Sequence, residues 1–450
     1  CPEEMGMEHD MLRRFGCALC ALAFALTALP TAAFAQQPEE QAAVQQSLSA
    51  TDVREMQQAD AAVTALTGGS DYAQMTEDER TDAALQQLDA LTAQGLVKQG
   101  SVYTDAENGM ISFTYSCGAL GGILLTDPEE ENTAALPELD ESRLQELAEN
   151  KRVGTAAIYY AFDNTINSTR YPYYAYMQTY WDSVGLQTDL DTTVTVSDLR
   201  RMGRYDLCIL STHGAYYTYE YGWLFKKTTT EPLILLTERS DFWSDLRYGF
   251  DLLAHRVVKV NGMYAVNGDF FRSAYRGNGI VLSETCEFYG KNGHVDTSMA
   301  DGLLAGGAKA VMGYVNNVYS VYSRSMLWAA VNRMIEGETL EQAVDYAKSI
   351  YGTDDIIWYN EQGGRRPHAA ASYAMLSGDR SAALPNPYTA EEAAAAARAV
   401  KTLGGEILEI RDANLNAYDI SHKIIVIKKV KNTASKFPRK AGTPTKEPLL

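Results

Sequence analysis

The chain is 450 residues long, 46% of its residues are hydrophobic, and its formal net charge is −19. That length allows about two or three domains with sizeable cores. The charge is uneven: residues 423–450 hold seven lysines and one arginine against one glutamate, a local +7 that leaves −26 on the rest. Because an acidic body repels phosphates, we expect no nucleic-acid partner.

Residues 1–35 have the pattern of an export signal preceded by a few upstream residues. Residues 11–14 (Met-Leu-Arg-Arg) give a positive start, and residues 17–29 form a short apolar core. Ala33-Phe34-Ala35 fits the small-x-small cleavage pattern. The apolar run is too short to favour a membrane-spanning helix. We therefore predict cleavage after Ala35 and a secreted or cell-surface protein.

Residues 36–150 are predicted to form a separate amino-terminal region that combines helices with a β-hairpin. The stretch 36–95 is rich in Ala and Gln, and Thr76 with Glu79 forms a capping box before leucines at helical spacing. The stretch 97–125 alternates apolar and polar residues after an Asn108-Gly109 turn, which is typical of a hairpin. An acidic linker or surface helix follows, and the whole region could serve as a prosegment.

Residues 151–385 alternate predicted strands and helices, a rhythm that indicates an α/β fold with a mostly parallel sheet flanked by helices. The expected strands cover residues 153–162, 192–196, 205–212, 279–285 and 308–315, and the expected helices cover 173–184, 197–202, 298–307, 324–336 and 339–351. Residues 232–275 interrupt this rhythm with apolar runs and hairpin signals, and their Phe242, Trp243 and Phe250 are expected to pack or to shape a cleft. Residues 386–450 are predicted to hold a helix, a short strand at 424–430 and a basic tail.

Two of the expected strands end in reactive side chains. The run 205–212 closes on His213-Gly214, and the run 279–285 closes on Cys286. Parallel strands bring such residues to one edge of a sheet, where a thiol and an imidazole can act as nucleophile and proton-transfer partner. Gly214 lets its amide approach a substrate closely, so the amides of Gly214 and Cys286 could stabilise an oxyanion. The alternative is a core histidine and an inert buried thiol.

The remaining cysteines and histidines carry weaker signals. Cys117 and Cys208 lie in apolar strand patterns and are expected to be small buried hydrophobes. His294, eight positions after Cys286, is a fallback imidazole. No His/Cys pair has ligand spacing, so we predict no metal site and no cofactor, and the sequence gives no sign of Ca²⁺ dependence.

These strand ends resemble those of caspase-like cysteine peptidases, the group that contains clostripain, gingipains, legumain and caspases. The resemblance is carried by Ser211-Thr212-His213-Gly214 and Ser283-Glu284-Thr285-Cys286, and segments 299–313 and 371–379 are also similar. It covers residues 150–385. It implies an exported cysteine endopeptidase acting on proteins or peptides, in which Cys286 attacks the scissile carbonyl and His213 protonates the leaving amine. The 73 positions that separate His213 from Cys286 are more than compact members of the group have.

The resemblance also suggests substrate-binding residues. Glu284 would pair with a basic P1 side chain, Arg or Lys, with Asn as the second choice, or it would only accept hydrogen bonds behind the site. Asp163 and Asn164 could line the pocket or orient the imidazole, although turn chemistry explains Asn164 equally well. Two competing classes stay open: a catalytically inactive surface binding module of the same fold, and a thiol-redox protein.

Overall fold

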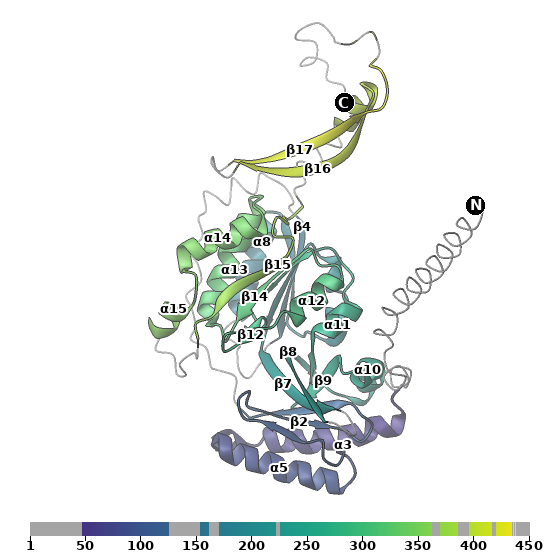
Figure 1. Ribbon diagram of the computed structural model, residues 1–450, viewed down its shortest axis with the longest axis vertical. Helices are drawn as coiled ribbons and strands as arrows, with labels where there is room; N and C mark the ends of the chain where they lie inside the picture. Colours follow the sequence, from purple (N-terminus) through teal and green to yellow (C-terminus); the bar gives the residue numbers. More distant parts are fainter. Residues whose placement is uncertain are drawn as a thin grey trace, which may run out of the picture.

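The computed structural model describes residues 47–125, 154–161, 171–221, 226–361, 370–385, 396–415, 420–433, 435 and 437. The predicted export signal, the acidic linker, Asp163, Asn164 and the end of the basic tail lie outside these residues. Figure 1 shows two main β-sheets, one below the other in this view, with helices around them and a separate hairpin towards the carboxyl terminus. The α/β class is therefore confirmed, whereas the caspase-like form of the sheet stays a prediction.

The first sheet has six strands in the order β15-β14-β11-β6-β4-β5. Its strands are β4 (Gly154–Ala161), β5 (Leu186–Asp191), β6 (Leu207–Thr212), β11 (Ile280–Ser283), β14 (Ala310–Val315) and β15 (Tyr373–Gly378). Neighbouring strands from β5 to β14 pair in parallel, and β15 closes one edge in the antiparallel direction. Every residue of β6, β11 and β14 is buried, as expected for a parallel sheet covered on both faces.

Helices cover both faces of this parallel sheet. On one face lie α8 (Tyr171–Ser183), α13 (Ser320–Ile335) and α14 (Leu340–Tyr351), whose apolar side chains share a core with alternate strand residues. On the other face lie α9 (Val196–Leu199), α11 (Gly268–Ala274) and α12 (Ser298–Ala305). The short elements η1 (Met202–Arg204) and α15 (Ile356–Glu361) complete this part of the chain.

The strand expected at 192–196 is wrong. The strand β5 ends at Asp191, and the capping box of Thr195 with Asp198 starts α9 directly afterwards. Thr195 accepts from the amide of Asp198, while the carboxylate of Asp198 accepts from the amide of Thr195. β-branched residues raised the strand propensity of this stretch, but the capping box decided the local structure.

The second sheet has seven strands in the order β1-β2-β3-β9-β10-β8-β7. They are β1 (Tyr103–Asp105), β2 (Met110–Thr114), β3 (Leu120–Leu124), β7 (Gly214–Tyr221), β8 (Lys227–Arg239), β9 (Val257–Val260) and β10 (Met263–Val266). The strand β3 pairs in parallel with β9, so the amino-terminal strands complete a sheet built by residues 214–266. The division into domains at residue 150 stays a prediction.

Three helices, α3 (Ala50–Thr67), α5 (Glu77–Ala93) and α10 (Phe242–Leu253), pack on this second sheet. The short helix α4 (Ser70–Gln74) lies between α3 and α5, and Arg80 of α5 donates to two of its carbonyls. The predicted capping box of Thr76 and Glu79 begins α5, and Asp241 caps α10. Figure 1 shows α3 and α5 running along the strand β2.

Two further pieces lie outside the two main sheets. A short hairpin joins β12 (Gly290–Lys291) to β13 (His294–Val295), and a long hairpin joins β16 (Gly405–Leu415) to β17 (Ile420–Lys429) after a helical stretch at 396–402. The strand expected at 424–430 overlaps β17, which begins earlier, at Ile420, and ends at Lys429. Among the described residues, none of the helices has both the length and the hydropathy to cross a membrane.

Candidate functional sites

The ends of β6 and β11 meet at the carboxyl edge of the parallel sheet. Register pairs Ser283 with Leu210, and the hydroxyls of Thr212 and Thr285 lie 2.9 Å apart. Next along each strand come His213-Gly214 and Cys286. A Cβ at Gly214 would lie 2.1 Å from the carbonyl oxygen of Cys286, so only glycine permits this approach. The fold thus brings together segments that lie 73 positions apart in the sequence.

The side chains at this edge are half-buried. Cys286 and His213 are both partly exposed, and the amide of Val318 donates to the Cys286 Sγ at 3.4 Å. The carbonyl of His213 accepts from the amide of Leu235 at 2.9 Å, which fixes the backbone where β6 passes into β7. Cys208 is buried within β6 and Cys117 is half-buried, in line with the expectation that they pack as small hydrophobes.

Glu284 is buried and belongs to a chain of hydroxyl groups behind this edge. Ser211 donates to the Tyr174 hydroxyl at 2.7 Å, and that hydroxyl donates to Glu284 at 2.6 Å. Ser323 donates to the other oxygen of Glu284 at 3.3 Å. The carboxylate therefore links β11 to the helices α8 and α13. Asp163 and Asn164 lie outside the described residues. The catalytic roles predicted for His213, Gly214 and Cys286 stay predictions. So do the substrate-binding roles predicted for Glu284, Asp163 and Asn164.

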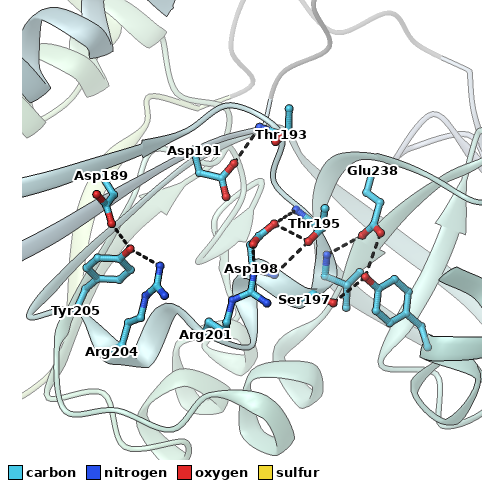
Figure 2. Close-up of polar contacts among 12 residues, drawn as sticks. Asp189, Asp191, Thr193, Thr195, Ser197, Asp198, Arg201, Arg204, Tyr205 and Glu238 are labelled. Carbon is cyan, nitrogen blue, oxygen red and sulfur yellow. Dashed lines mark hydrogen bonds and ion pairs between the residues drawn. The ribbon is translucent and has the colours of Figure 1, made fainter.

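A second polar site lies at the open edge of the same sheet, where β5 ends. A cavity of about 250 Å³ lies between β4, β5 and the segment α9–η1. Its polar lining includes Asp189, Asp191, Asp198, Arg201 and Arg204. Figure 2 shows Asp191 between the Tyr205–Arg204 pair and the Asp198–Arg201 pair. Carboxylate acceptors and guanidinium donors suit a small polar molecule. Sequence reasoning missed this site because its residues lie on separate elements.

Hydrogen bonds order the lining of this cavity. Arg204 donates to the Tyr205 hydroxyl at 2.6 Å, and that hydroxyl donates to Asp189. Asp191 accepts from the amide of Thr193 at 3.0 Å. Burial raises the pKa of the Asp191 carboxyl, and the nearby negative charge of Asp198 adds to the effect, while the Thr193 hydrogen bond opposes it.

The carboxyl-terminal hairpin has a different character from both sites. Its strand β17 and the residues after it expose Lys428 and Lys431, and Lys429 contacts the Leu403 carbonyl and the Thr433 hydroxyl. These lysines belong to the basic stretch 423–450, whose charge opposes that of the rest of the chain. The described residues of this basic stretch therefore lie in the strand β17 and directly after it.

Within the described ranges, no group of three or more His, Cys, Asp or Glu side chains is placed to hold a metal ion. The expectation of no cofactor, with Ca²⁺ as the open question, stays a prediction.

Comparison with known proteins finds partial matches to ribosomal RNA small subunit methyltransferases G. No family model matches the chain. A stretch of 63 residues is 52% identical to part of the ribosomal RNA small subunit methyltransferase G of Alkaliphilus oremlandii, which covers 14% of this chain and 26% of that protein. The protein of the same name from Clostridium novyi is 44% identical over 68 residues, 15% of this chain and 28% of the relative. That from Lactobacillus johnsonii is 40% identical over 67 residues. The chain spans about a quarter of the length of these curated relatives.

These relatives overturn the functional predictions. The resemblance to caspase-like cysteine peptidases, the endopeptidase activity and the alternative of an inactive binding module were wrong, because the relatives are named as RNA methyltransferases. The pattern was too general: any parallel sheet places strand-end residues side by side, and a cysteine beside a histidine does not define an enzyme class.

The partner prediction was also wrong. Protein or peptide substrates without nucleic acid do not agree with relatives that are named for ribosomal RNA. The physical reason lies in averaging: the net charge of −19 hides a stretch of +7 at residues 423–450. Phosphates respond to charge within about 10 Å at ordinary ionic strength, so a local basic segment acts almost independently of a distant acidic body.

Proposed function

We propose that this chain binds RNA, and that ribosomal RNA of the small subunit is the partner to test first. The observation that carries the proposal is the similarity of a stretch of about 63–68 residues to ribosomal RNA small subunit methyltransferase G. The basic stretch 423–450 supports it, because lysine and arginine supply most of the affinity of proteins for phosphate backbones.

The hairpin β16–β17 is the proposed contact surface within the described residues. Lys428 and Lys431 are exposed there and carry charges that can replace counterions on a phosphate backbone. Each phosphate contact with a single strand changes the slope of log affinity against log salt by about 0.7. Two contacts therefore account for a slope difference of about 1.4.

The test measures binding of the full chain to small-subunit ribosomal RNA fragments at several salt concentrations. We expect K428E/K431E to weaken binding by about tenfold or more at low salt and to make the salt slope shallower. The double variant K98E/K227E is the matched control, since Lys98 and Lys227 are also exposed but lie on the second sheet region. Equal effects of the two double variants, or no binding by the wild type, would overturn the proposal.

Methyl transfer to RNA is the second part of the proposal. It comes from the name of the relatives, of which this chain spans about a quarter. The assay incubates the full chain with ribosomal RNA and S-adenosylmethionine labelled in its methyl group, the common biological methyl donor. We expect label in the RNA above a protein-free control. If the chain binds the RNA but adds no label to it, the proposal of RNA binding stands and the proposal of methyl transfer is overturned.

Export stays a separate proposal, supported by the signal pattern at residues 11–35. Export and contact with ribosomes place the protein in different compartments, so one fractionation experiment separates them. The expected result for export is a mature product that begins at Gln36 outside the cell. Recovery of the uncleaved chain with ribosomes would overturn export and favour RNA binding.

A further inference from the structure

The cavity beside the edge strand β5 has the size of a small organic molecule. Its volume of about 250 Å³ equals the share of about eight water molecules, at roughly 30 Å³ each in the liquid. Pockets for drug-sized ligands are larger, at about 300–1,000 Å³. The strand β4 contributes Ala157 and the Tyr159 ring to the lining, so part of the wall is apolar. The cavity can therefore hold a molecule of roughly eight non-hydrogen atoms with an apolar part.

Four of the five charged side chains in the lining balance each other. Arg201 forms an ion pair with Asp198. Arg204 donates to the Tyr205 hydroxyl at 2.6 Å, and that hydroxyl donates to Asp189. The second guanidinium and the second carboxylate are thus joined through one hydroxyl group, and these four charges sum to zero.

The fifth charged side chain is Asp191. It is half-buried, and its carboxylate accepts from the amide of Thr193 at 3.0 Å. Within the part of the chain that the structure describes, no lysine or arginine forms an ion pair with it. Figure 2 shows Asp191 between the two balanced pairs. The lining therefore carries one net negative charge, which belongs to Asp191.

Charged side chains next to the lining do not cancel this charge. Arg200 is directed to another carboxylate, that of the buried Asp251. Two neighbouring carboxylates are held by backbone amides: Glu238 accepts from the first amide of α9 at 2.8 Å, and Asp206 accepts from an amide of β4 at 2.9 Å. A cation that neutralises Asp191 must therefore come from a ligand.

The geometry favours an organic cation over a metal ion. Among the described residues, no three His, Cys, Asp or Glu side chains are placed to hold a metal, so the three lining carboxylates do not converge on one point. A hard metal such as Ca²⁺ needs six to eight oxygen ligands. An ammonium group has only three N–H donors to satisfy, and a hydrocarbon body fills space that a bare ion leaves empty.

We propose that this cavity binds a small primary amine in its ammonium form, with Asp191 as the counter-ion. The ammonium group donates a charge-assisted hydrogen bond to the carboxylate, which is about twice as strong as a neutral one. The hydrocarbon part of the amine lies against Ala157 and Tyr159. This inference goes beyond the proposed RNA binding and does not depend on it.

The experiment measures binding of benzylammonium to the full chain by ligand-observed NMR at fixed ionic strength. Benzylammonium has about eight non-hydrogen atoms, the number that the cavity volume allows. Benzyl alcohol and benzoate keep the ring but remove or reverse the charge. We expect the wild type to bind benzylammonium at least about tenfold more tightly than either compound, a difference of about 1.4 kcal/mol.

Three variants test the role of charge. D191N removes the charge but keeps an oxygen that can accept from the Thr193 amide, and we expect it to bind benzylammonium at least about tenfold more weakly. D345N is the matched control, because Asp345 is exposed on α14, and it should bind as the wild type does. R201Q leaves Asp198 without its cation and should bind at least as tightly as the wild type. Thermal unfolding checks that each variant keeps its fold.

The outcomes decide the inference without reference to RNA. Absence of benzylammonium binding by the wild type would overturn it. Equal affinities for benzylammonium and benzoate, or weaker binding of benzylammonium by R201Q, would overturn charge as the basis of recognition. Equal affinities of D191N and D345N would remove Asp191 as the counter-ion. A wild type that binds benzylammonium but no RNA would overturn only the proposed function.

Discussion

The two sheets bury polar groups in different ways. Behind the parallel sheet, Glu284 accepts from hydroxyls in the chain Ser211–Tyr174–Glu284–Ser323. The second sheet instead buries the cation of Lys259, which pairs with Asp60 and with Asp245 at 2.8 Å. The Lys259 side chain has no exposed surface.

The difference lies in the groups that join the elements. Behind the parallel sheet, neutral hydroxyls connect β6, α8 and α13 to the single carboxylate that follows β11. The second sheet collects α3, α10 and β9 from distant parts of the sequence, and its charges join them: Asp60, Asp245 and Lys259 come from these three elements. A buried ion pair adds little net stability but strongly penalises any arrangement that separates its members. Four changes test this contrast.

The largest effect is expected for K259M. Removing the cation leaves the carboxylates of Asp60 and Asp245 buried without it, which typically costs about 3–5 kcal/mol of the free energy of unfolding. Urea denaturation measures the loss. K227M, which changes an exposed lysine at the start of β8, is the control and should stay within about 0.5 kcal/mol of the wild type. If K259M and K227M lost the same free energy of unfolding, the buried charges of Lys259, Asp60 and Asp245 would not hold α3, α10 and β9 together.

The next effect concerns Glu231 of β8 and depends on pH. Burial raises the pKa of this carboxyl to about 7, although the hydrogen bond from Asn267 lowers it. The folded state therefore holds a proton that the unfolded state has released between about pH 4.5 and pH 7, so stability falls as pH rises through this window.

We expect E231Q to remove this fall. A shift of this size corresponds to roughly 2–3 kcal/mol across the window. The measurement is the free energy of unfolding at pH 5 and pH 8 for wild type and E231Q. E341Q, at an exposed position paired with Arg380, should keep the wild-type dependence. A wild type with the same stability at both pH values would contradict the prediction.

A smaller effect is expected in the hydroxyl chain of the parallel sheet. Y174F removes the hydroxyl that joins Ser211 to Glu284 and leaves the buried carboxylate with fewer donors. Leaving such a group short of a partner costs about 1–3 kcal/mol. Thermal and urea unfolding measure it, with the exposed Y346F as control. If Y174F lost as much free energy of unfolding as K259M, the hydroxyl chain would matter as much as the buried ion pairs, and the contrast between the two sheets would fail.

The smallest effect is expected for D245N. Two carboxylates face one ammonium group in the Lys259 cluster, and burial raises the pKa of Asp245 while Lys259 opposes that shift. Lys259 donates to Oδ2 of Asp245 and Tyr264 donates to Oδ1. An Asn with its amide oxygen at the Oδ2 position still accepts from Lys259, its NH2 group can donate to the Tyr264 hydroxyl oxygen, and Asp60 still supplies a negative charge. We expect a change within about 1 kcal/mol at pH 7. A loss above about 3 kcal/mol would show that both carboxylates are needed.

Local signals in the sequence predicted much of the parallel sheet. The apolar runs gave β4, β6, β11 and β14 nearly at their observed bounds, because a strand buried on both faces must be continuously apolar. The capping box of Thr76 and Glu79 fixed the start of α5. The long hairpin β7–β8 and the helix α10 were missed. The strands β7 and β8 are rich in Tyr and Thr and lack the continuous apolar runs by which the strands of the parallel sheet were recognised.

The sites were predicted unevenly. That His213 and Cys286 end strands followed from periodicity, but the functional class inferred from them was wrong, because residue types at a sheet edge do not identify a reaction. The cavity beside Asp191 and the cluster around Lys259 carried no sequence signal, since their members lie on separate elements. The exclusion of nucleic acid was wrong because net charge sums over regions that phosphates encounter separately.

By itself, then, the sequence determined the elements whose stability is local: capped helices, doubly buried strands and the basic stretch at residues 423–450. Only the tertiary structure decided which strands share a sheet, which charges pair in the interior and which aromatic rings stay in solvent. The 72% exposure of Trp243 is the clearest case. Local propensity depends on neighbours a few residues away, whereas burial depends on contacts between segments far apart in the chain, and those contacts form only when the whole molecule folds.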